Sequence, residues 1–282
     1  MTRNIMFQAA TSSAGKSTLT ALLCRELFLK GIKVAPFKAQ NLSLNSFVTR
    51  EGGEIGISQA YQAWACGLEP RNDMNPILLK PKGNGMQIVL DGRPYQDIDR
   101  HSHVDREELL AHIRDAYLRL CRDFDAIVIE GSGSPAEVNL RDKDVANMAT
   151  ARMLKAPVVL IGDIDKGGVF AGLYGTYKLL EERDQCLVKG FLINKFRGEA
   201  GILLSGIQRL EMEMRCPCLG VLPHHRFQAP AEDSMELGLQ ATGVGGDGDV
   251  REMWKKGLDD LSRAVVPHLD MARVDSIMQN GT

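Results

Sequence analysis

A short stretch near the N-terminus, residues 8–18, has the composition of a phosphate-binding loop. Small residues lead to Gly15, Lys16 and Ser17, the order in which such a loop (P-loop) places its glycine, lysine and hydroxyl. Small side chains let successive backbone N–H groups face a phosphate chain at a helix N-terminus, where the helix dipole also favours negative charge. Lys16 would then reach the β- and γ-phosphates, and the Ser17 hydroxyl would bind Mg²⁺. The stretch therefore predicts a nucleoside triphosphate site.

The segments on either side of this loop support the interpretation. Residues 4–7 are mostly apolar, as in a buried strand, and leucines recur at helical spacing from Leu19 to Leu27. The alternative is a helix N-terminus in which the order Gly-Lys-Ser is coincidental, and the flanking strand and helix argue against it. The loop departs from the common pattern at Ala10, where glycine is usual. Alanine lets a backbone pass close but resists positive φ.

Glu130 is a second candidate for chemistry, because it ends the near-continuous apolar run of residues 124–130. Such a run indicates a central parallel strand covered on both faces, and its carboxyl end is where open α/β sheets bind ligands. A carboxylate there predicts a magnesium ligand, direct or through water; the alternative is a cap for the following turn. Glu54, at the start of a helix expected over residues 57–66, has the same two interpretations.

The elements that must position these groups alternate along the chain. We expect strands over residues 4–7, 33–38, 124–130, 157–163, 188–194 and 218–222, with an edge strand over 87–90. We expect helices after the P-loop and over residues 57–66, 106–123, 145–155, 169–180 and up to Leu210. Residues 39–46 are expected to form a polar loop rich in amides. This alternation predicts an α/β fold, a doubly wound, mostly parallel sheet with helices on both faces.

The last part of the chain differs from the rest. We expect a P-loop domain over residues 1–226, a linker over 227–252 and a C-terminal helix over 253–282. Residues 241–249 are rich in glycine and aspartate, which suits a flexible linker. The apolar residues beyond it indicate one amphipathic helix: Met253, Leu258, Leu261, Val265 and Leu269.

Composition narrows the possible functions. The 282 residues are 44% hydrophobic and 25% charged, and the net charge of −2 gives no reason to expect nucleic acid or an anionic membrane as a partner. No apolar run approaches the ~20 residues of a membrane span, and no signal peptide is evident. The six cysteines include no Cys-x-x-Cys pair; Cys216 and Cys218 would need a second cluster to bind metal. We expect reduced structural thiols in a cytoplasmic protein.

Several stretches together carry a closer resemblance. They are residues 35–46, 52–56, 73–76, 78–81, 130–137, 139–140, 163–171 and 194–198. With them, the chain resembles the ATP-dependent synthetase domain of the cobyric acid synthase family, in the dethiobiotin-synthetase-like branch of P-loop proteins. The stretches occur in the family's order and cover nearly everything up to Pro223.

The resemblance implies that the chain amidates peripheral carboxylates of a corrinoid, converting cobyrinic acid a,c-diamide to cobyric acid through an acyl phosphate. It implies ATP and Mg²⁺ as cofactors, and we expect a homodimer. The catalytic residues would be Lys16, Lys38 and Glu130. Contacts to ATP are implied for Ser13, Ala14, Gly15, Lys16, Ser17, Thr18, Asn194 and Arg197. The metal ligands would be Ser17, Glu54 and Glu130. Contacts to the corrinoid are implied for Gln40, Asn41, Asn45, Ser134, Glu137, Asn139 and Asp163.

The chain departs from the family in two respects. Ala9 and Ala10 replace the Gly-Thr of the family's P-loop, and Ser13 stands where aspartate is usual. The family also continues into a glutaminase domain that supplies ammonia, and the residues after Pro223 are too few to contain it. Residues 228–234 resemble the family's interdomain linker and 258–270 its C-terminus, as if the glutaminase had been excised around 243–249. We therefore expect free ammonia, or a separate glutaminase subunit, as the nitrogen source.

Three other functions remain open. Another carboxylate-activating enzyme, such as dethiobiotin synthetase or the a,c-diamide synthase, would lack the amide-rich residues 40–45 and the 163–171 stretch. A ParA/MinD-like switch ATPase would carry an additional lysine early in the P-loop, and residues 10–13 contain none. An inactive paralogue would be consistent with the altered P-loop and the missing glutaminase. Corrinoid-dependent ATP turnover distinguishes these possibilities.

Overall fold

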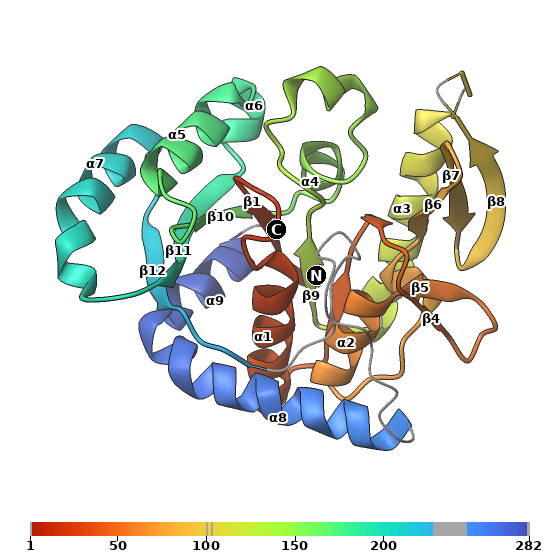
Figure 1. Cartoon of the computed structure of the whole chain (residues 1–282), viewed down its shortest axis with the longest axis horizontal. Coiled ribbons are helices and arrows are strands. Elements are labelled where there is room, and N and C mark those ends of the chain that lie inside the picture. Colours follow the sequence, from red (N-terminus) through yellow and green to blue (C-terminus); the bar gives the residue numbers. More distant parts are fainter. Residues whose placement is uncertain (1, 100, 103, 228–246, 281–282) are drawn as a thin grey trace.

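The computed structural model describes residues 2–99, 101–102, 104–227 and 247–280. Its centre is a six-stranded sheet in the order β12-β11-β10-β1-β9-β2, in which all neighbouring strands are parallel (Figure 1). These strands are β1 (Arg3–Ala9), β2 (Val34–Phe37), β9 (Ala126–Glu130), β10 (Val158–Asp163), β11 (Val188–Phe196) and β12 (Cys218–Pro223). The predicted parallel sheet is confirmed, and the carboxyl ends of β1, β9 and β10 meet at one edge of it.

Helices cover both faces of this sheet, as the alternation predicted. One face packs against α3 (Arg106–Asp123), α4 (Met148–Met153), α5 (Val169–Leu179) and α7 (Leu204–Met214). The other packs against α1 (Lys16–Leu29), α8 (Asp247–Val265) and α9 (Met271–Asn280). The remaining helical segments are α2 (Ile57–Ala65), α6 (Glu182–Gln185), η1 (Asn72–Met74), η2 (Val138–Lys143), η3 (Ala200–Leu203) and η4 (Val266–His268). No helix within the described ranges is long and apolar enough to cross a membrane.

A second, smaller sheet lies beside the first, in the order β3-β6-β7-β8. Its strands are β3 (Gln40–Leu42), β6 (Ile77–Lys82), β7 (Gly85–Leu90) and β8 (Arg93–Ile98), and β4 (Ser46–Val48) pairs with β5 (Glu54–Gly56) in a separate hairpin. The strand predicted over 87–90 is present as β7, but its predicted position at a sheet edge is wrong. Tight turns at residues 83–84 and 91–92 fold β6, β7 and β8 back on one another, so β7 is paired on both sides. Residues 39–46, expected to be a loop, contain β3 and the start of β4.

The C-terminal part is two helices rather than the single helix predicted. Pro267 lies in η4 at the break, because proline cannot continue a helix, and the Asp270 carboxylate then accepts a hydrogen bond from the Arg273 N–H at 3.0 Å to begin α9. Leu269 forms an isolated β-bridge with Gly220 of β12. A side chain at position 220 would meet the His268 carbonyl oxygen. α8 begins at Asp247, inside the range predicted as linker; the rest of that range, from 228 to 246, lies outside the described residues.

Candidate active site

The P-loop connects β1 to α1, and Gly15 and Ser13 give it its shape. Gly15 has φ 99°, and a side chain there would meet the Asn194 amide. Ser13 has φ 57°, so the left-handed turn falls on a serine. Ala10 does not have positive φ and donates its N–H to Ile161 O at 3.0 Å, continuing the pairing of β1 with β10. The substitution of alanine for glycine at this position is therefore compatible with the backbone.

Three donors, two near the end of β11 and one in the loop after β10, hold successive carbonyl groups of the P-loop. Lys166 Nζ donates to Ser12 O at 2.9 Å, Lys195 Nζ to Ser13 O at 2.6 Å and Asn194 Nδ2 to Ala14 O at 2.8 Å. These bonds occupy carbonyl groups of the loop, and in a P-loop it is the backbone N–H groups that bind an anion.

Glu130 lies at the end of β9, 1% exposed, at the centre of a polar cluster. Its Oε1 accepts hydrogen bonds from Ser17 Oγ at 2.6 Å and Lys38 Nζ at 2.7 Å. Its Oε2 accepts from Gln62 Nε2 at 2.6 Å and, more weakly, from Gln59 Nε2 at 3.4 Å. The structure thus brings together Ser17, Lys38 and Glu130 as predicted, and adds two glutamines.

The charge of Glu130 follows from these contacts. Burial by itself raises the pKa of a carboxyl, but the Lys38 ammonium and the hydrogen bonds from Lys38, Ser17 and Gln62 outweigh it and hold the pKa of Glu130 below its usual value. Glu130 is therefore a carboxylate at neutral pH, paired with the Lys38 cation in a buried site.

The donor set beside the P-loop suits a hard cation. Ser17 Oγ and the Glu130 carboxylate are oxygen ligands, and Gln62 Oε1 is a buried oxygen that accepts no hydrogen bond from the described residues. No three His, Cys, Asp or Glu side chains within those residues cluster as a metal site. Mg²⁺ needs no such cluster, because one or two carboxylates together with nucleotide phosphates and water suffice. The residues present fit magnesium bound with a nucleotide.

Lys16 lies at the N-terminus of α1, 8% exposed, and donates to Gly133 O at 3.0 Å in the loop after β9. That loop is held by Asn147, whose Oδ1 accepts from Ser132 N at 3.0 Å and whose Nδ2 donates to Ser132 O at 2.6 Å. Lys16 therefore lies between the P-loop and the segment after Glu130, and its contact with the terminal phosphates stays a prediction.

Glu54, predicted as a metal ligand, has other partners. Its carboxylate pairs with Lys80 Nζ at 2.7 Å. Partial burial raises the pKa of Glu54, but hydrogen bonds from Lys80 and Ser46 and the charge of Lys80 outweigh it, so the pKa is lowered. Among the described residues, Glu54 has no hydrogen bond to Ser17 or Glu130, and its role as a ligand stays a prediction.

The other predicted contacts to ATP divide between two places. Thr18 is half-buried in the first turn of α1, next to Ser17. Arg197 lies beyond β11 and pairs with Asp165 at 3.1 Å. Asn194, predicted to bind the adenine, uses one amide hydrogen on Ala14 O. Its amide oxygen accepts the Lys195 N–H at 2.9 Å, so it holds the loop in this structure.

The residues predicted to bind the corrinoid form two groups. Asn41 is buried and donates to Gln59 Oε1 at 2.9 Å, which connects it to Glu130 through one amide. Asp163 is buried and pairs with Lys195 at 2.9 Å, behind the P-loop. The others are exposed or half-buried, in β3, in the turn between β3 and β4, and in the segment after β9 up to η2: Gln40, Asn45, Ser134, Glu137 and Asn139.

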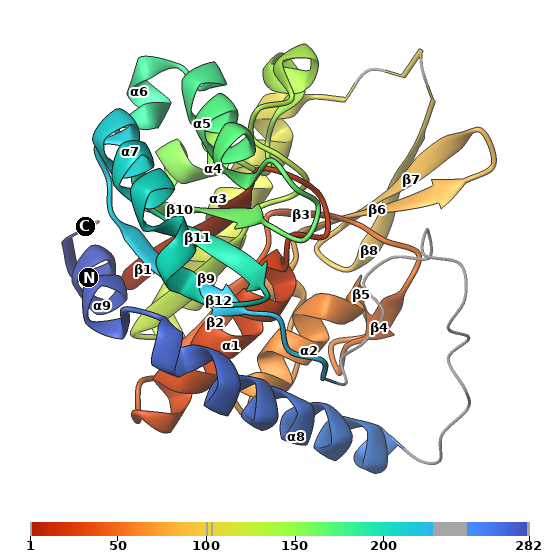
Figure 2. The same cartoon turned by 60° about the vertical axis from the view of Figure 1, so that its left-hand side comes forward.

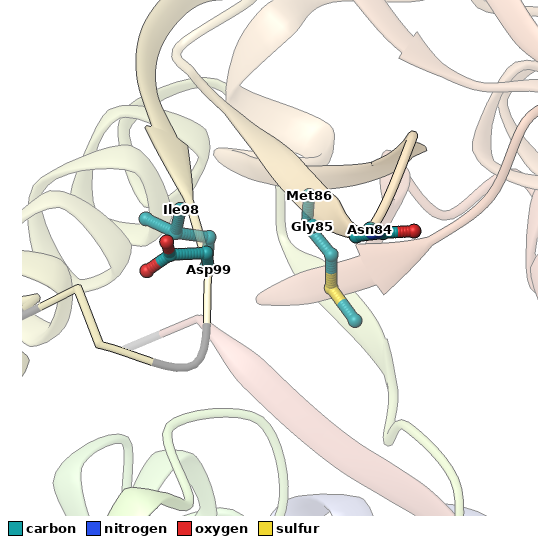
Figure 3. Close-up of a pocket in the computed structure, with 5 residues that line it drawn as sticks. All are labelled: Asn84, Gly85, Met86, Ile98 and Asp99. Atoms are coloured by element: carbon teal, nitrogen blue, oxygen red, sulfur yellow. The ribbon is translucent and has the colours of Figure 1, made fainter.

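A hollow between the two strand ends of the β7–β8 hairpin is lined by Asn84, Gly85, Met86, Ile98 and Asp99 (Figure 3). None of the predicted site residues contributes to it. The hollow lies at the open end of the hairpin, and we assign it no function.

Sequence reasoning missed Gln59, Gln62, Asn147, Lys166 and Lys195 as parts of the site. A signal existed for the two glutamines, because they are three residues apart in the otherwise apolar helix α2 and so share a face. Two amides on one buried face require a polar partner. Which partner they meet depends on the packing of α2 against α1 and β2, which brings the two amides to Glu130.

Known proteins are similar to the part of the chain that carries this site. The model of the CobQ/CobB/MinD/ParA nucleotide binding domain matches residues 5–236. The probable cobyric acid synthase of Methanosarcina mazei is 50% identical over 238 residues, which cover 84% of this chain and 49% of that protein. The cobyric acid synthase of Thermodesulfovibrio yellowstonii is 53% identical over 226 residues, which cover 79% of this chain and 46% of that protein. The chain spans about half the length of these curated relatives.

Among solved structures, the signal recognition particle receptor FtsY of Elizabethkingia anophelis aligns with a TM-score of 0.45 and 13% identity. The alignment covers 93% of this chain and 64% of that one.

Proposed function

Because the chain belongs to the CobQ/CobB/MinD/ParA nucleotide binding domain family, we propose that it uses ATP to activate a corrinoid carboxylate for amidation. The observation that carries the proposal is the contact of Ser17 and Lys38 with the buried Glu130 carboxylate, beside the P-loop lysine. The sequence identity to cobyric acid synthases supports the choice of a corrinoid, with cobyrinic acid a,c-diamide as the substrate and cobyric acid as the product.

The first step joins two anions. An oxygen of the substrate carboxylate attacks the γ-phosphorus, the bond from that phosphorus to the β,γ-bridging oxygen breaks, and ADP leaves. Lys16 and the P-loop N–H groups offset the negative charge on the phosphates, and Ser17 and Glu130 would hold Mg²⁺, which neutralises the phosphate oxygens when bound. Lys38 is paired with the Glu130 carboxylate in this structure. We expect it to contact the transferring phosphoryl group instead if Glu130 holds Mg²⁺.

The second step forms the amide. The nitrogen lone pair of ammonia attacks the acyl carbon, the bond from that carbon to the phosphate oxygen breaks, phosphate leaves, and the nitrogen loses one proton. The chain's own residues contribute by holding the acyl phosphate away from water, because hydrolysis would waste the ATP.

We propose ammonia, free or passed from a partner glutaminase, as the nitrogen source of this 282-residue chain. Glutamine hydrolysis needs an activated thiolate, and burial instead raises the pKa of Cys216 to about 12 and that of Cys218 to about 11. Burial also raises the pKa values of the Cys24 and Cys121 thiols. These four thiols are therefore poor nucleophiles at neutral pH.

The test is ATP hydrolysis with ammonium chloride, with and without a corrinoid a,c-diamide, followed by mass analysis of the corrinoid. We expect turnover that depends on the corrinoid and product that gains amides, more of it at higher pH as the fraction of NH₃ rises. Glutamine alone should give no product. Product formed as readily from glutamine would overturn the ammonia proposal. ATP binding without product from either source would favour an inactive paralogue.

A further inference from the structure

Helix α8 packs against the outer side of α2 through an aromatic cluster. The Trp254 ring stacks on Trp64 with centroids 5.7 Å apart, and it meets Tyr61 edge-on at 6.0 Å. The Arg251 guanidinium lies 4.5 Å from the centroid of the Trp64 ring. Figures 1 and 2 both show α8 running across α1 and α2 on the outside of the molecule. The C-terminal part of the chain is therefore in contact with the helix that carries Gln59 and Gln62.

The two faces of α2 contact different parts of the molecule. Gln62 and Trp64 are two positions apart, which turns their side chains about 200° from each other around the helix. The glutamines face Glu130, and Tyr61 and Trp64 face α8. A shift of α2 on its α8 side must therefore move the amides on its Glu130 side, because a helix this short moves as one body.

Gln62 is the contact through which such a shift would reach the site. Its Nε2 lies 2.6 Å from Glu130 Oε2 and 3.3 Å from Ser17 O, so it spans β9 and α1. α8 is fixed to α1 as well, by the Arg25–Asp259 ion pair at 2.9 Å and the Ser262 hydroxyl on Glu26 at 2.5 Å. Helix α8 thus contacts both α1 and α2 on their outer side, and in this way it sets the position of α2 relative to the P-loop helix α1.

We propose that Trp254 is a positioning residue for the magnesium–nucleotide site, acting through α2, Gln62 and Glu130. The proposal rests on the proposed function for the identity of the ligand, and it concerns a residue outside the site. Partners that orient a ligand of a metal typically change metal affinity about 10-fold to 100-fold when removed. Trp254 is one contact further away, so we expect about tenfold.

The experiment measures ADP affinity by calorimetry, with Mg²⁺ and with EDTA, on the full chain. For Trp254→Ala we expect about a tenfold loss of affinity with Mg²⁺ and little change in EDTA, because the P-loop itself is untouched. Trp254→Phe keeps an aromatic ring and should retain most of the Mg²⁺-dependent affinity. Arg251→Ala, a milder change on the same face, should lose about threefold.

Met278→Ala is the matched control. Met278 of α9 is buried whereas Trp254 is half-buried, and Met278 packs on the same side of the sheet without being part of the aromatic cluster on α2. It should lower the melting temperature as Trp254→Ala does but keep wild-type Mg²⁺-dependent affinity. Equal losses in both variants, or wild-type affinity in Trp254→Ala, would overturn the proposal.

The chain has two tryptophans, Trp64 and Trp254, so intrinsic fluorescence reports on this contact directly. If α2 couples the two sites, Mg·ADP should change the emission of the stacked pair, and Gln62→Ala should abolish that change. If the wild-type protein binds Mg·ADP and its tryptophan emission does not change, the coupling is contradicted. A wild-type protein that binds ADP no better with Mg²⁺ would instead refute the proposed magnesium site itself.

Discussion

The nucleotide side of the site and the side predicted to receive the corrinoid are built differently. Glu130 is 1% exposed and accepts hydrogen bonds from α1, α2 and the residue after β2, while three loop carbonyls are each held by a side chain. On the other side, Gln40 and Asn45 are half-buried or exposed, beside Leu42, Leu44 and Val48, which are 44%, 52% and 71% exposed.

The difference matches what each side would do under the proposed function. Charge that develops during phosphoryl transfer is stabilised best by groups fixed in advance, which cost no reorganisation. A large ring that carries both apolar faces and amides is bound by a surface that presents both kinds of group. We therefore expect substitutions on the nucleotide side to affect turnover strongly, and substitutions on the other side to affect substrate affinity weakly.

Lys16→Ala should have the largest effect, about a thousandfold lower turnover, because its charge offsets the repulsion between the two anions. The fold should persist, since the alanine keeps the helical backbone of α1 and the change is at one residue of its first turn. Turnover is measured with saturating ATP, and circular dichroism checks the fold. Wild-type turnover in a well-folded Lys16→Ala protein would remove the P-loop from the mechanism.

Glu130→Gln should lower turnover about a hundredfold and weaken its dependence on Mg²⁺. It also leaves the Lys38 charge, 10% exposed, without its partner, and losing one member of a buried pair costs about 3 kcal/mol of unfolding free energy. Urea titration measures the stability. The double variant Glu130→Gln/Lys38→Met removes both charges and should recover stability but not turnover. If the single variant keeps its Mg²⁺ dependence, Glu130 only caps its turn.

Acid should destabilise the wild type through the same carboxylate. The pKa of Glu130 is lower in the folded protein than its usual value of 4.5, so the folded state binds fewer protons than the unfolded one. The stabilisation is present above pH 4.5 and is lost as pH falls through the folded pKa. Urea titrations at a series of pH values below 5 should show a shallower loss in Glu130→Gln/Lys38→Met than in the wild type. Parallel curves would place the acid sensitivity in other carboxylates.

Asn45→Ala should have the smallest effect, about a threefold higher KM for the corrinoid with an unchanged KM for ATP, because it removes one exposed hydrogen-bonding group. Initial rates against corrinoid concentration measure it. An equal change in both KM values would show that the two sides are not independent, and would erase the contrast between them.

Much of the architecture was predictable because its signals are local. The alternation of apolar runs predicted the parallel sheet, and helix α3 begins and ends at the predicted residues. The order Gly15-Lys16-Ser17 predicted the P-loop, and the strand-end position of Glu130 predicted a carboxylate at the site. In the structure the Ser17 hydroxyl donates a hydrogen bond to the Glu130 carboxylate.

The parts that were missed depend on distant partners. That β7 is paired on both sides follows from two hairpins, and the break at Pro267 is stabilised by the pairing of Leu269 with Gly220. Gln62 meets Glu130 because α2 packs against α1 and β2, which no spacing within α2 reveals. The tolerance of Ala10 depends on φ values that a comparison of residue types cannot supply.

The docking of the C-terminal helices has a consequence for how the chain is made. α9 packs against β1, so the strand of residues 3–9 is covered by a helix of residues 271–280, far later in the chain. Until Leu269 reaches Gly220, the edge of β12 presents unpaired backbone groups, and α1 lacks the cover of Leu258 and Leu261. Contacts of such wide sequence separation form slowly. Until residues 258–280 are in place, the nascent protein therefore exposes apolar surface and a strand edge, which favours aggregation.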